Sequence, residues 1–123
     1  MKNVLITGAY GGMGYKTVKE LARQGYTVFA LDKKVKEAEE NVVPIEVDVT
    51  DVESVTKAFE KVKAITDNLF AIIHFAGVYM LDSLIEIPIE EFEKIFKINL
   101  FGAFLINKIF KSLLQKGSKI VIT

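Results

Sequence analysis

The sequence has 123 residues, half of them hydrophobic, which suffices for one packed domain and leaves no room for a second. Sixteen basic residues balance sixteen acidic ones, so there is no net basic field to attract nucleic acid or anionic lipid. Because cysteine is absent and His74 is the only histidine, neither a disulfide nor a metal site is expected. The longest apolar runs fall short of the ~18 residues of a membrane span and no signal-peptide pattern is present, so we expect a cytoplasmic protein without a membrane partner.

The chain opens with the pattern of one strand and one helix. Val4–Thr7 is a short apolar run that ends at glycines, which predicts a buried strand. Apolar residues then recur at helical spacing over Gly12–Gln24, and Gly25 stands where a helix C-cap is expected. The spacing predicts that the core-facing side of this helix is formed by Met13, Val18, Leu21 and Ala22.

Two further buried strands follow, separated by a charged segment. Thr27–Leu31 is predicted to be the second strand, which ends at Asp32. The segment Lys33–Asn41 is too charged to enter the core, so we predict a surface loop or a short helix there. The apolar run Val42–Val47 predicts the third strand.

The next pair of elements is again a helix and a strand. Thr50 can cap a helix over about Asp51–Thr66, and Leu69–His74 is the fourth predicted strand. Helical spacing predicts one apolar face on this helix, made of Val52, Val55, Phe59, Val62 and Ile65.

The last third of the chain predicts a long helix and a fifth strand. Pro88 fits the first turn of a helix that runs to about Gln115 and ends at Gly117, and Lys119–Thr123 is the fifth strand. Alternating strands and helices predict an α/β fold with a Rossmann-type doubly wound parallel sheet in three layers. With right-handed crossovers, the simplest strand order is 3-2-1-4-5.

A glycine-rich turn joins the first strand to the first helix and carries the strongest functional signal. Gly8 permits a tight turn, and Gly14 allows the helix and the strand to pack closely. Gly11 or Gly12 lets a pyrophosphate approach the backbone, and the helix N-terminus offers unpaired N–H groups to the phosphates. A P-loop is excluded because Tyr15 stands where that motif requires lysine.

Four landmarks in order resemble the short-chain dehydrogenase/reductase family and cover nearly the whole chain. The family's Thr-Gly-x-x-x-Gly-x-Gly signature is met in the glycine turn, and the other three landmarks follow the third strand, end the fourth strand and lie in the long helix. In this sequence they are Thr7, Gly8, Gly12 and Gly14; Asp48-Val49-Thr50-Asp51; His74-Phe75-Ala76-Gly77; and Asn99-Leu100-Phe101-Gly102.

The resemblance implies an oxidoreductase that transfers hydride between a nicotinamide cofactor and a small alcohol or carbonyl substrate. It also implies that residues 1–123 form the NAD(P)-binding Rossmann domain, incomplete and truncated after the fifth strand. The residues expected to bind the cofactor are Gly8, Tyr10, Gly11, Gly12, Met13, Gly14, Asp32, Lys33, Asp48, Val49, Ala76 and Gly77.

The end of the second strand favours NAD over NADP. Asp32 stands 24 residues after Gly8, where an acid accepts hydrogen bonds from the adenosine ribose and repels a 2′-phosphate. The glycine turn carries no Lys or Arg to receive that phosphate. However, Lys33 and Lys34 follow at once and could swing toward it, so NADP remains possible.

Two residues depart from the family pattern at the end of the fourth strand. His74 and Phe75 replace two asparagines, which puts the polar contacts of those asparagines in doubt. We interpret His74 as a strand-end residue with a local hydrogen-bond partner rather than as an acid or base. The glycines also fit the spacing of the family's extended branch, but the segment after Leu81 favours the shorter, single-domain branch.

Catalytic residues are largely missing from the pattern. Asn99 is the one candidate, because in the family an asparagine in this helix helps to organise a proton relay. The family's Ser, Tyr and Lys cannot be assigned here, and the sequence reaches Thr123 about where the serine is expected. Tyr79, Asp82 and Ser83 follow the fourth strand but stay unassigned.

The long helix is apolar on several sides, so we expect it to pack against more than one partner and to support a homo-oligomer.

Two functions remain open. The first is part of an NAD(P)-dependent oxidoreductase; the alternative is a non-catalytic dinucleotide-binding or redox-sensing module. A nucleotide-free scaffold is disfavoured by the glycines and by Asp32.

Overall fold

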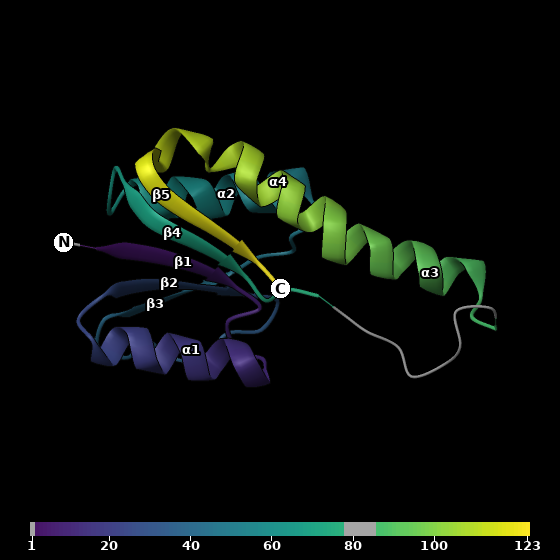
Figure 1. Ribbon diagram of the computed structural model, residues 1–123, viewed down its shortest axis with the longest axis horizontal. Coiled ribbons are helices and arrows are strands. Elements are labelled where there is room, and N and C mark those ends of the chain that lie inside the picture. Colours follow the sequence, from purple (N-terminus) through teal and green to yellow (C-terminus); the bar gives the residue numbers. More distant parts are fainter. Residues whose placement is uncertain (1, 78–85) are drawn as a thin grey trace.

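The computed structural model describes residues 2–77 and 86–123, which form one parallel sheet with helices on both faces (Figure 1). The five strands stand in the order β3-β2-β1-β4-β5, as the sequence predicted. Helix α1 covers one face, and α2 and α4 cover the other, which gives the three predicted layers. In chain order the elements are β1 (Asn3–Thr7), α1 (Gly12–Arg23), β2 (Thr27–Asp32), β3 (Val42–Glu46), α2 (Val52–Lys63), β4 (Leu69–His74), α3 (Ile89–Phe96), the π-helical turn η1 (Lys97–Phe101), α4 (Gly102–Ile109), the 3-10 turn η2 (Lys111–Leu113) and β5 (Leu114–Ile122).

The sheet separates two hydrophobic clusters, and successive residues of a strand enter opposite ones. Leu5 of β1 packs into the larger cluster, which includes Val55 of α2 and Phe110 after α4. Its neighbours Val4 and Ile6 pack into the second cluster with residues of α1. Because both faces of the central strands are covered, these strands are apolar throughout rather than alternating. Strand β1 is therefore packed on both faces, and the glycine turn begins at the end of this strand.

Several element ends differ from the predicted ones, and polar contacts explain two of them. The α2 helix is capped by Asp51, whose carboxylate accepts a hydrogen bond from the Glu53 N–H at 3.3 Å. The predicted cap, Thr50, instead donates its hydroxyl to Asp48 at 2.7 Å. The helix also ends at Lys63, before Thr66, whose hydroxyl accepts a hydrogen bond at 2.8 Å from the buried Asn3 side chain of β1.

The long helix is shorter and less regular than predicted. Pro88 precedes it as the N-cap residue, and the helix passes through η1 and ends at Ile109 rather than near Gln115. Strand β5 consequently begins at Leu114 and not at Lys119. Its pairing with β4 shifts register between Leu69 and Ala71, where the Ser118 hydroxyl donates to the Leu69 carbonyl at 2.7 Å.

Three side chains predicted to face the core are exposed at helix ends. Met13 is 69% exposed in the first turn of α1, and Val52 and Ile65 lie at and beyond the two ends of α2. Helical spacing alone does not reveal that the end turns of a helix project beyond the sheet. Within residues 2–77 and 86–123, no helix combines the length and apolar character that crossing a bilayer requires.

The turn after β1 packs against both α1 and β4 without any intervening side chain. A Cβ atom added at Gly14 would lie 2.0 Å from the Gly8 carbonyl oxygen. One added at Gly8 would lie 2.5 Å from the backbone nitrogen of Ala76, and Gly8 itself has a φ of 65°. Both positions therefore require glycine, for close approach at Gly14 and for close approach and backbone conformation at Gly8.

His74 links the end of β4 to α4. Its side chain is buried, and its Nε2 lies 2.8 Å from Oδ1 of Asn107. Burial lowers the pKa of His74, and the hydrogen bond to Asn107 opposes that shift in part. The residue has the local partner that the sequence analysis expected, and it contributes a cross-link between two elements.

Gly14→Ala is expected to destabilise the fold, and Gly12→Ala supplies the matched control. The new methyl group at position 14 meets backbone atoms that cannot rotate away, so the loss in unfolding free energy should be at least ~1–3 kcal/mol. A Cβ at Gly12, in the same turn of α1, meets nothing within 4 Å, so that variant should melt near or slightly above the unmodified chain. Thermal unfolding followed by circular dichroism measures both, and equal melting temperatures would contradict the packing argument.

The lowered pKa of His74 predicts a pH-dependent stability. The unfolded chain binds a proton near pH ~6.5, whereas the folded chain binds it only at lower pH. The unfolded state therefore holds more protons in that window, so the contribution of His74 is complete above it and is lost as the pH falls through it. His74→Asn keeps a polar partner for Asn107 but cannot titrate. Urea unfolding across this range should show a smaller loss of stability for the variant, and parallel curves would refute the assignment.

Candidate functional site

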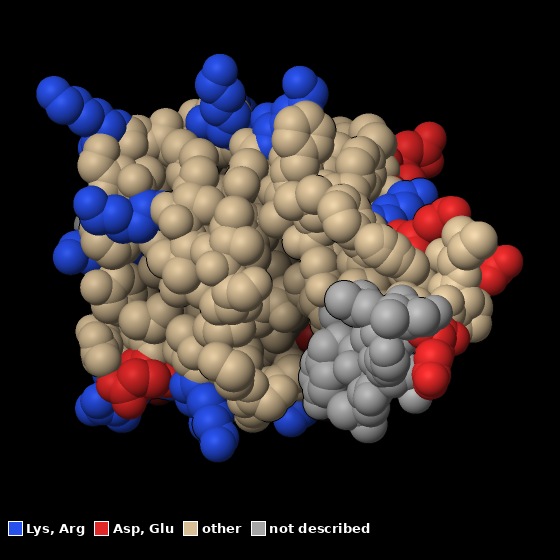
Figure 2. Space-filling model, turned by 45° about the vertical axis from the view of Figure 1, so that its right-hand side comes forward, with Lys and Arg blue, Asp and Glu red and all other residues tan. Residues whose placement is uncertain are grey.

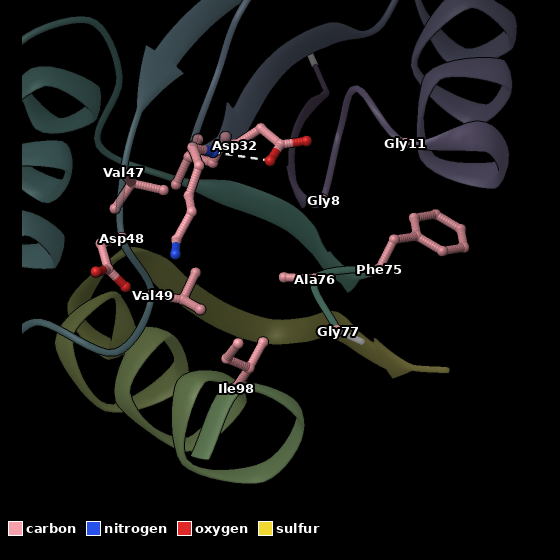
Figure 3. Close-up of a pocket in the computed structure, with 12 residues that line it drawn as sticks. Gly8, Gly11, Asp32, Val47, Asp48, Val49, Phe75, Ala76, Gly77 and Ile98 are labelled. Carbon is pink, nitrogen blue, oxygen red and sulfur yellow. Dashed lines mark hydrogen bonds between the residues drawn. The ribbon is translucent and has the colours of Figure 1, made fainter. Parts of the chain in front are cut away.

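A cavity of about 250 Å³ opens at the carboxyl ends of the strands (Figure 3). It lies where β1 and β4 are neighbours and the order of the strands along the sheet reverses, the usual position of ligand sites in open α/β sheets. Backbone of the glycine turn forms one side, and residues that follow β3 and β4 form the others. The lining residues are Gly8, Gly11, Leu31, Asp32, Lys33, Val47, Asp48, Val49, Phe75, Ala76, Gly77 and Ile98.

The glycine turn presents backbone rather than side chains to the cavity. The Gly11 N–H donates to the Gly8 carbonyl at 3.2 Å, and the Ala9 N–H donates to Leu31 of β2 at 3.1 Å, which fixes the turn on the sheet. Gly11 is the N-cap residue of α1, and within the described part of the chain no side-chain hydrogen bond caps the start of that helix. The first turn of α1 also contains no acidic residue. The helix N-terminus thus combines free donors with the positive end of the helix dipole.

Asp32 holds a carboxylate at the end of β2. Its Oδ2 accepts the backbone N–H of Tyr10 at 2.9 Å, and its Oδ1 accepts the N–H of Lys33 at 2.7 Å. These two bonds fix the side chain between the glycine turn and the end of β2, as Figure 3 shows for the bond to Lys33. A fixed acceptor at this edge can bind hydroxyl groups and repel an anion.

Asp48 supplies a second carboxylate on the far side of the cavity. Its Oδ1 accepts hydrogen bonds from both the N–H and the hydroxyl of Thr50, at 3.0 and 2.7 Å. These bonds hold the pKa of Asp48 below its usual range, and the nearby charges of Lys33 and Lys97 lower it further. Since both bonds fall on one oxygen, Oδ2 remains available to a ligand as far as the described contacts go.

The π-helical turn η1 borders the cavity through Ile98. Asn99 lies in η1, and a Cβ on Gly77 would lie 2.8 Å from its Oδ1. A Cβ on Gly102 would lie 2.7 Å from Cγ2 of Val49. The two glycines thus let the helix approach both the end of β4 and the segment after β3. A π-helical turn of this kind is often found at functional positions.

Eight of the twelve residues predicted to bind a cofactor line the cavity, and four do not. Those that line it are Gly8, Gly11, Asp32, Lys33, Asp48, Val49, Ala76 and Gly77. The remaining four lie nearby in the glycine turn and in α1: the backbone of Tyr10 binds Asp32, Gly12 opens the helix, Met13 is exposed, and Gly14 is buried behind Gly8.

Sequence reasoning did not identify four apolar lining residues. Leu31 lies in β2 and Val47 directly follows β3. The apolar pattern of these strands already explained both residues, so nothing in the sequence marked them as part of a site. Ile98 comes from η1, next to Asn99, and only its position beside that residue could have pointed to it. The Phe75 ring turns away from the Val49 side of the cavity (Figure 3). Tyr79, Asp82 and Ser83 lie outside the described residues.

Comparison with known proteins agrees with this geometry. The sequence model of the family described as "short chain dehydrogenase" matches residues 2–123. Mouse estradiol 17-beta-dehydrogenase 2 is 37% identical to this chain and is matched over 94% of it, and the uncharacterized oxidoreductase YbbO of Escherichia coli K12 is 36% identical over 99% of it. These matches cover 34% and 48% of the two relatives.

A solved structure of a short chain dehydrogenase family protein from Francisella tularensis superposes on the whole chain with a TM-score of 0.87 at 29% identity, and 50% of that protein is covered. The chain therefore spans about a third to a half of the length of the proteins that it matches. Since the family model covers all but the first residue, this chain belongs to the short chain dehydrogenase family.

Proposed function

We propose that this chain binds NAD(P) in the cavity between the glycine turn and the end of β4, as the cofactor-holding part of an oxidoreductase that acts on an alcohol or a carbonyl compound. One observation carries the proposal. The cavity has bare glycine backbone and the N-terminus of α1 on one side and the fixed carboxylate of Asp32 on another. Membership of a family of NAD(P)-dependent oxidoreductases supports it.

The residues present fit a dinucleotide. At Gly8 a side chain would collide with the backbone that follows β4. Gly11 and Gly12 likewise keep side chains out of the approach to α1, so phosphates can reach the N–H groups there. Asp32 would accept the ribose hydroxyls. The free oxygen of Asp48 and the backbone of Val49 would hold the adenine, and Ala76 and Gly77 would let the cofactor pass close to β4.

The chemistry of hydride transfer belongs to the nicotinamide when it is bound. The role of this chain would be to bind and orient the nicotinamide and to surround it with apolar side chains. Asn99 is proposed as a positioning residue for proton transfer, because η1 brings it against Gly77 at the cavity. No Ser, Tyr and Lys of this sequence can be assigned the roles that these residues have in the family, so the proposal limits the chain to holding the cofactor.

The fixed carboxylate of Asp32 favours NAD over NADP, because it accepts from two ribose hydroxyls but repels a 2′-phosphate. Lys33 also lines the cavity, and its charge lowers the pKa of the Asp48 carboxyl group. Because Lys33 and Lys34 directly follow Asp32 and could meet a 2′-phosphate, NADP is the second candidate.

Asp32→Asn is expected to weaken NADH binding about 10- to 100-fold, because hydrogen bonds to a charged acceptor are lost. NADPH binding should weaken less or improve, since the repulsion of the 2′-phosphate disappears. Cofactor fluorescence during titration measures both constants. Asp67→Asn removes the same charge in the loop before β4, at the opposite end of the strands, and should leave both unchanged. If a folded Asp32→Asn variant binds NADH as tightly as the parent chain, the assignment of Asp32 to the ribose site is wrong.

Self-association through the long helix is part of the proposal. Along α3, η1 and α4 six large hydrophobic side chains are exposed, namely Ile89, Phe92, Phe96, Leu100, Phe101 and Phe104. The face in Figure 2 carries its charged side chains mainly along the margin, with a broad uncharged area between them. Phe92, Phe96, Leu100, Phe101 and Phe104 line one open groove along the helix, and contiguous apolar surface of this kind is typical of protein interfaces. A cytoplasmic location stays a prediction from the sequence.

A double substitution, Phe96→Glu with Phe104→Glu, should lower the mean particle mass in light scattering by disrupting this surface. Val52→Glu, which adds a charge at a comparably exposed apolar position on α2, should leave the mass unchanged. A parent chain that is already a monodisperse monomer at the same concentration would contradict the expectation.

A further inference from the structure

His74 joins the end of β4 to two neighbouring elements. Its carbonyl accepts the N–H of Thr123 at 3.3 Å and the hydroxyl of the same residue at 2.8 Å, so the strand end is fixed against the end of β5. Its ring Nε2 lies 2.8 Å from Oδ1 of Asn107 in α4. An amide oxygen can only accept, so the Nε2–H of His74 donates this bond. The strand end and the helix are thus joined at a defined point of each.

The same helical segment reaches the proposed cofactor cavity eight residues before Asn107. Asn99 and Ile98 lie in η1, and Ile98 lines the cavity. A Cβ on Gly77 would lie 2.8 Å from Oδ1 of Asn99, so this side chain meets the backbone that follows β4. Two asparagines of one helical segment therefore contact the same end of β4, one at His74 and the other at Gly77.

The π-helical turn η1 makes this double contact possible. In a regular α-helix, two residues eight positions apart point about 80° away from each other around the axis. One extra residue in a wide turn reduces that difference to about the 20° that remains after seven residues. Because η1 supplies such a turn, Asn99 and Asn107 project from nearly the same side of the helix. If the turn relaxed to an α-helix, one of the two contacts with the end of β4 would be lost.

Apolar packing holds α4 on the sheet but leaves its rotation to polar contacts. Leu105 and Ile106 of α4 are buried in the larger hydrophobic cluster. Burial of apolar surface is non-directional, whereas a hydrogen bond has a fixed partner and a preferred angle. His74 is buried, so its ring N–H would be left without a partner if the helix turned away, which is costly. The bond to Asn107 therefore opposes the rotation that would relax η1.

We propose that His74 is a positioning residue for the cofactor cavity, because its bond to Asn107 keeps η1 in the π-helical form. This form holds Asn99 and Ile98 at the cavity. The inference rests on the proposed cofactor site and on the role proposed there for Asn99. His74 is not among the described residues that line the cavity, so it acts on the cofactor through the helix.

Asn107→Leu in the full chain removes the acceptor and nearly keeps the volume of the side chain. In amide NMR spectra recorded without ligand, the signals of the Gly77 N–H and of the Asn99 side-chain amide should both shift, because η1 relaxes. The NADH dissociation constant, measured by cofactor fluorescence, should rise about fivefold, the size expected for one net hydrogen bond. Asn107→Asp keeps an acceptor at the same distance from the backbone, so it should rescue most of the NADH affinity.

Val18→Ala is the matched control for a purely structural effect. Val18 is fully buried in the cluster on the other face of the sheet, so this substitution lowers stability without touching α4. At a temperature where both variants are folded, the Gly77 and Asn99 signals of Val18→Ala should stay in place. If Val18→Ala shifts them as much as Asn107→Leu does, the effect of the bond is only on stability and the proposal fails.

The outcomes separate this inference from the proposed function. Unchanged Gly77 and Asn99 signals in a folded Asn107→Leu variant overturn the inference, whether or not the chain binds NADH. If the signals shift but the NADH affinity does not change, the cofactor site stands and the positioning role is refuted. A parent chain that binds neither NADH nor NADPH refutes the proposed function, and the role of His74 in it fails as well.

Should Asn107→Leu not fold, Asn107→Ser replaces it, because the shorter side chain withdraws the acceptor from His74. The same shifts and the same loss of NADH affinity are expected, and their absence in the folded serine variant overturns the proposal.

Discussion

Two glycines bring three backbone segments closer together than any side chain would allow. Gly14 places the start of α1 against the carbonyl of Gly8, and Gly8 places the end of β1 against the backbone that follows β4. The start of α1 therefore lies in direct backbone contact with the end of β1, which in turn contacts the backbone that follows β4. The cavity is what remains beside that point, so its position follows from backbone contact more than from any side chain.

This constraint explains why the site is made largely of backbone and small residues. Almost no side-chain volume is contributed by Gly8, Gly11, Ala76 and Gly77. The carboxylates of the cavity belong to the end of β2 and to the segment after β3. Asp32 reaches the site because the Tyr10 N–H holds it against the turn. Parallel strands deliver all of these residues to one edge, which brings positions far apart in the sequence into one cavity.

Sequence reasoning recovered the features that local chemistry determines. The strand order followed from alternating elements, and the glycine turn and Asp32 from their spacing. The predicted ends of helices and strands were wrong where contacts between residues far apart in the sequence determine them. The start of β5 depends on a register shift beside Leu69, and the end of α2 depends on a bond between Thr66 and Asn3, 63 residues away.

The bond between His74 and Asn107 bears on how this sequence can diverge. The two side chains are 33 positions apart in the sequence, and His74 is buried whereas Asn107 is only partly buried. A change at Asn107 leaves the ring nitrogen of the buried His74 unpaired, which is costly until position 74 changes too. Position 107 should therefore change mainly after position 74 has changed, so the pair restricts which sequences can be reached by single substitutions. A departure from the family pattern at the end of β4 thus has its counterpart in a helix that no motif includes.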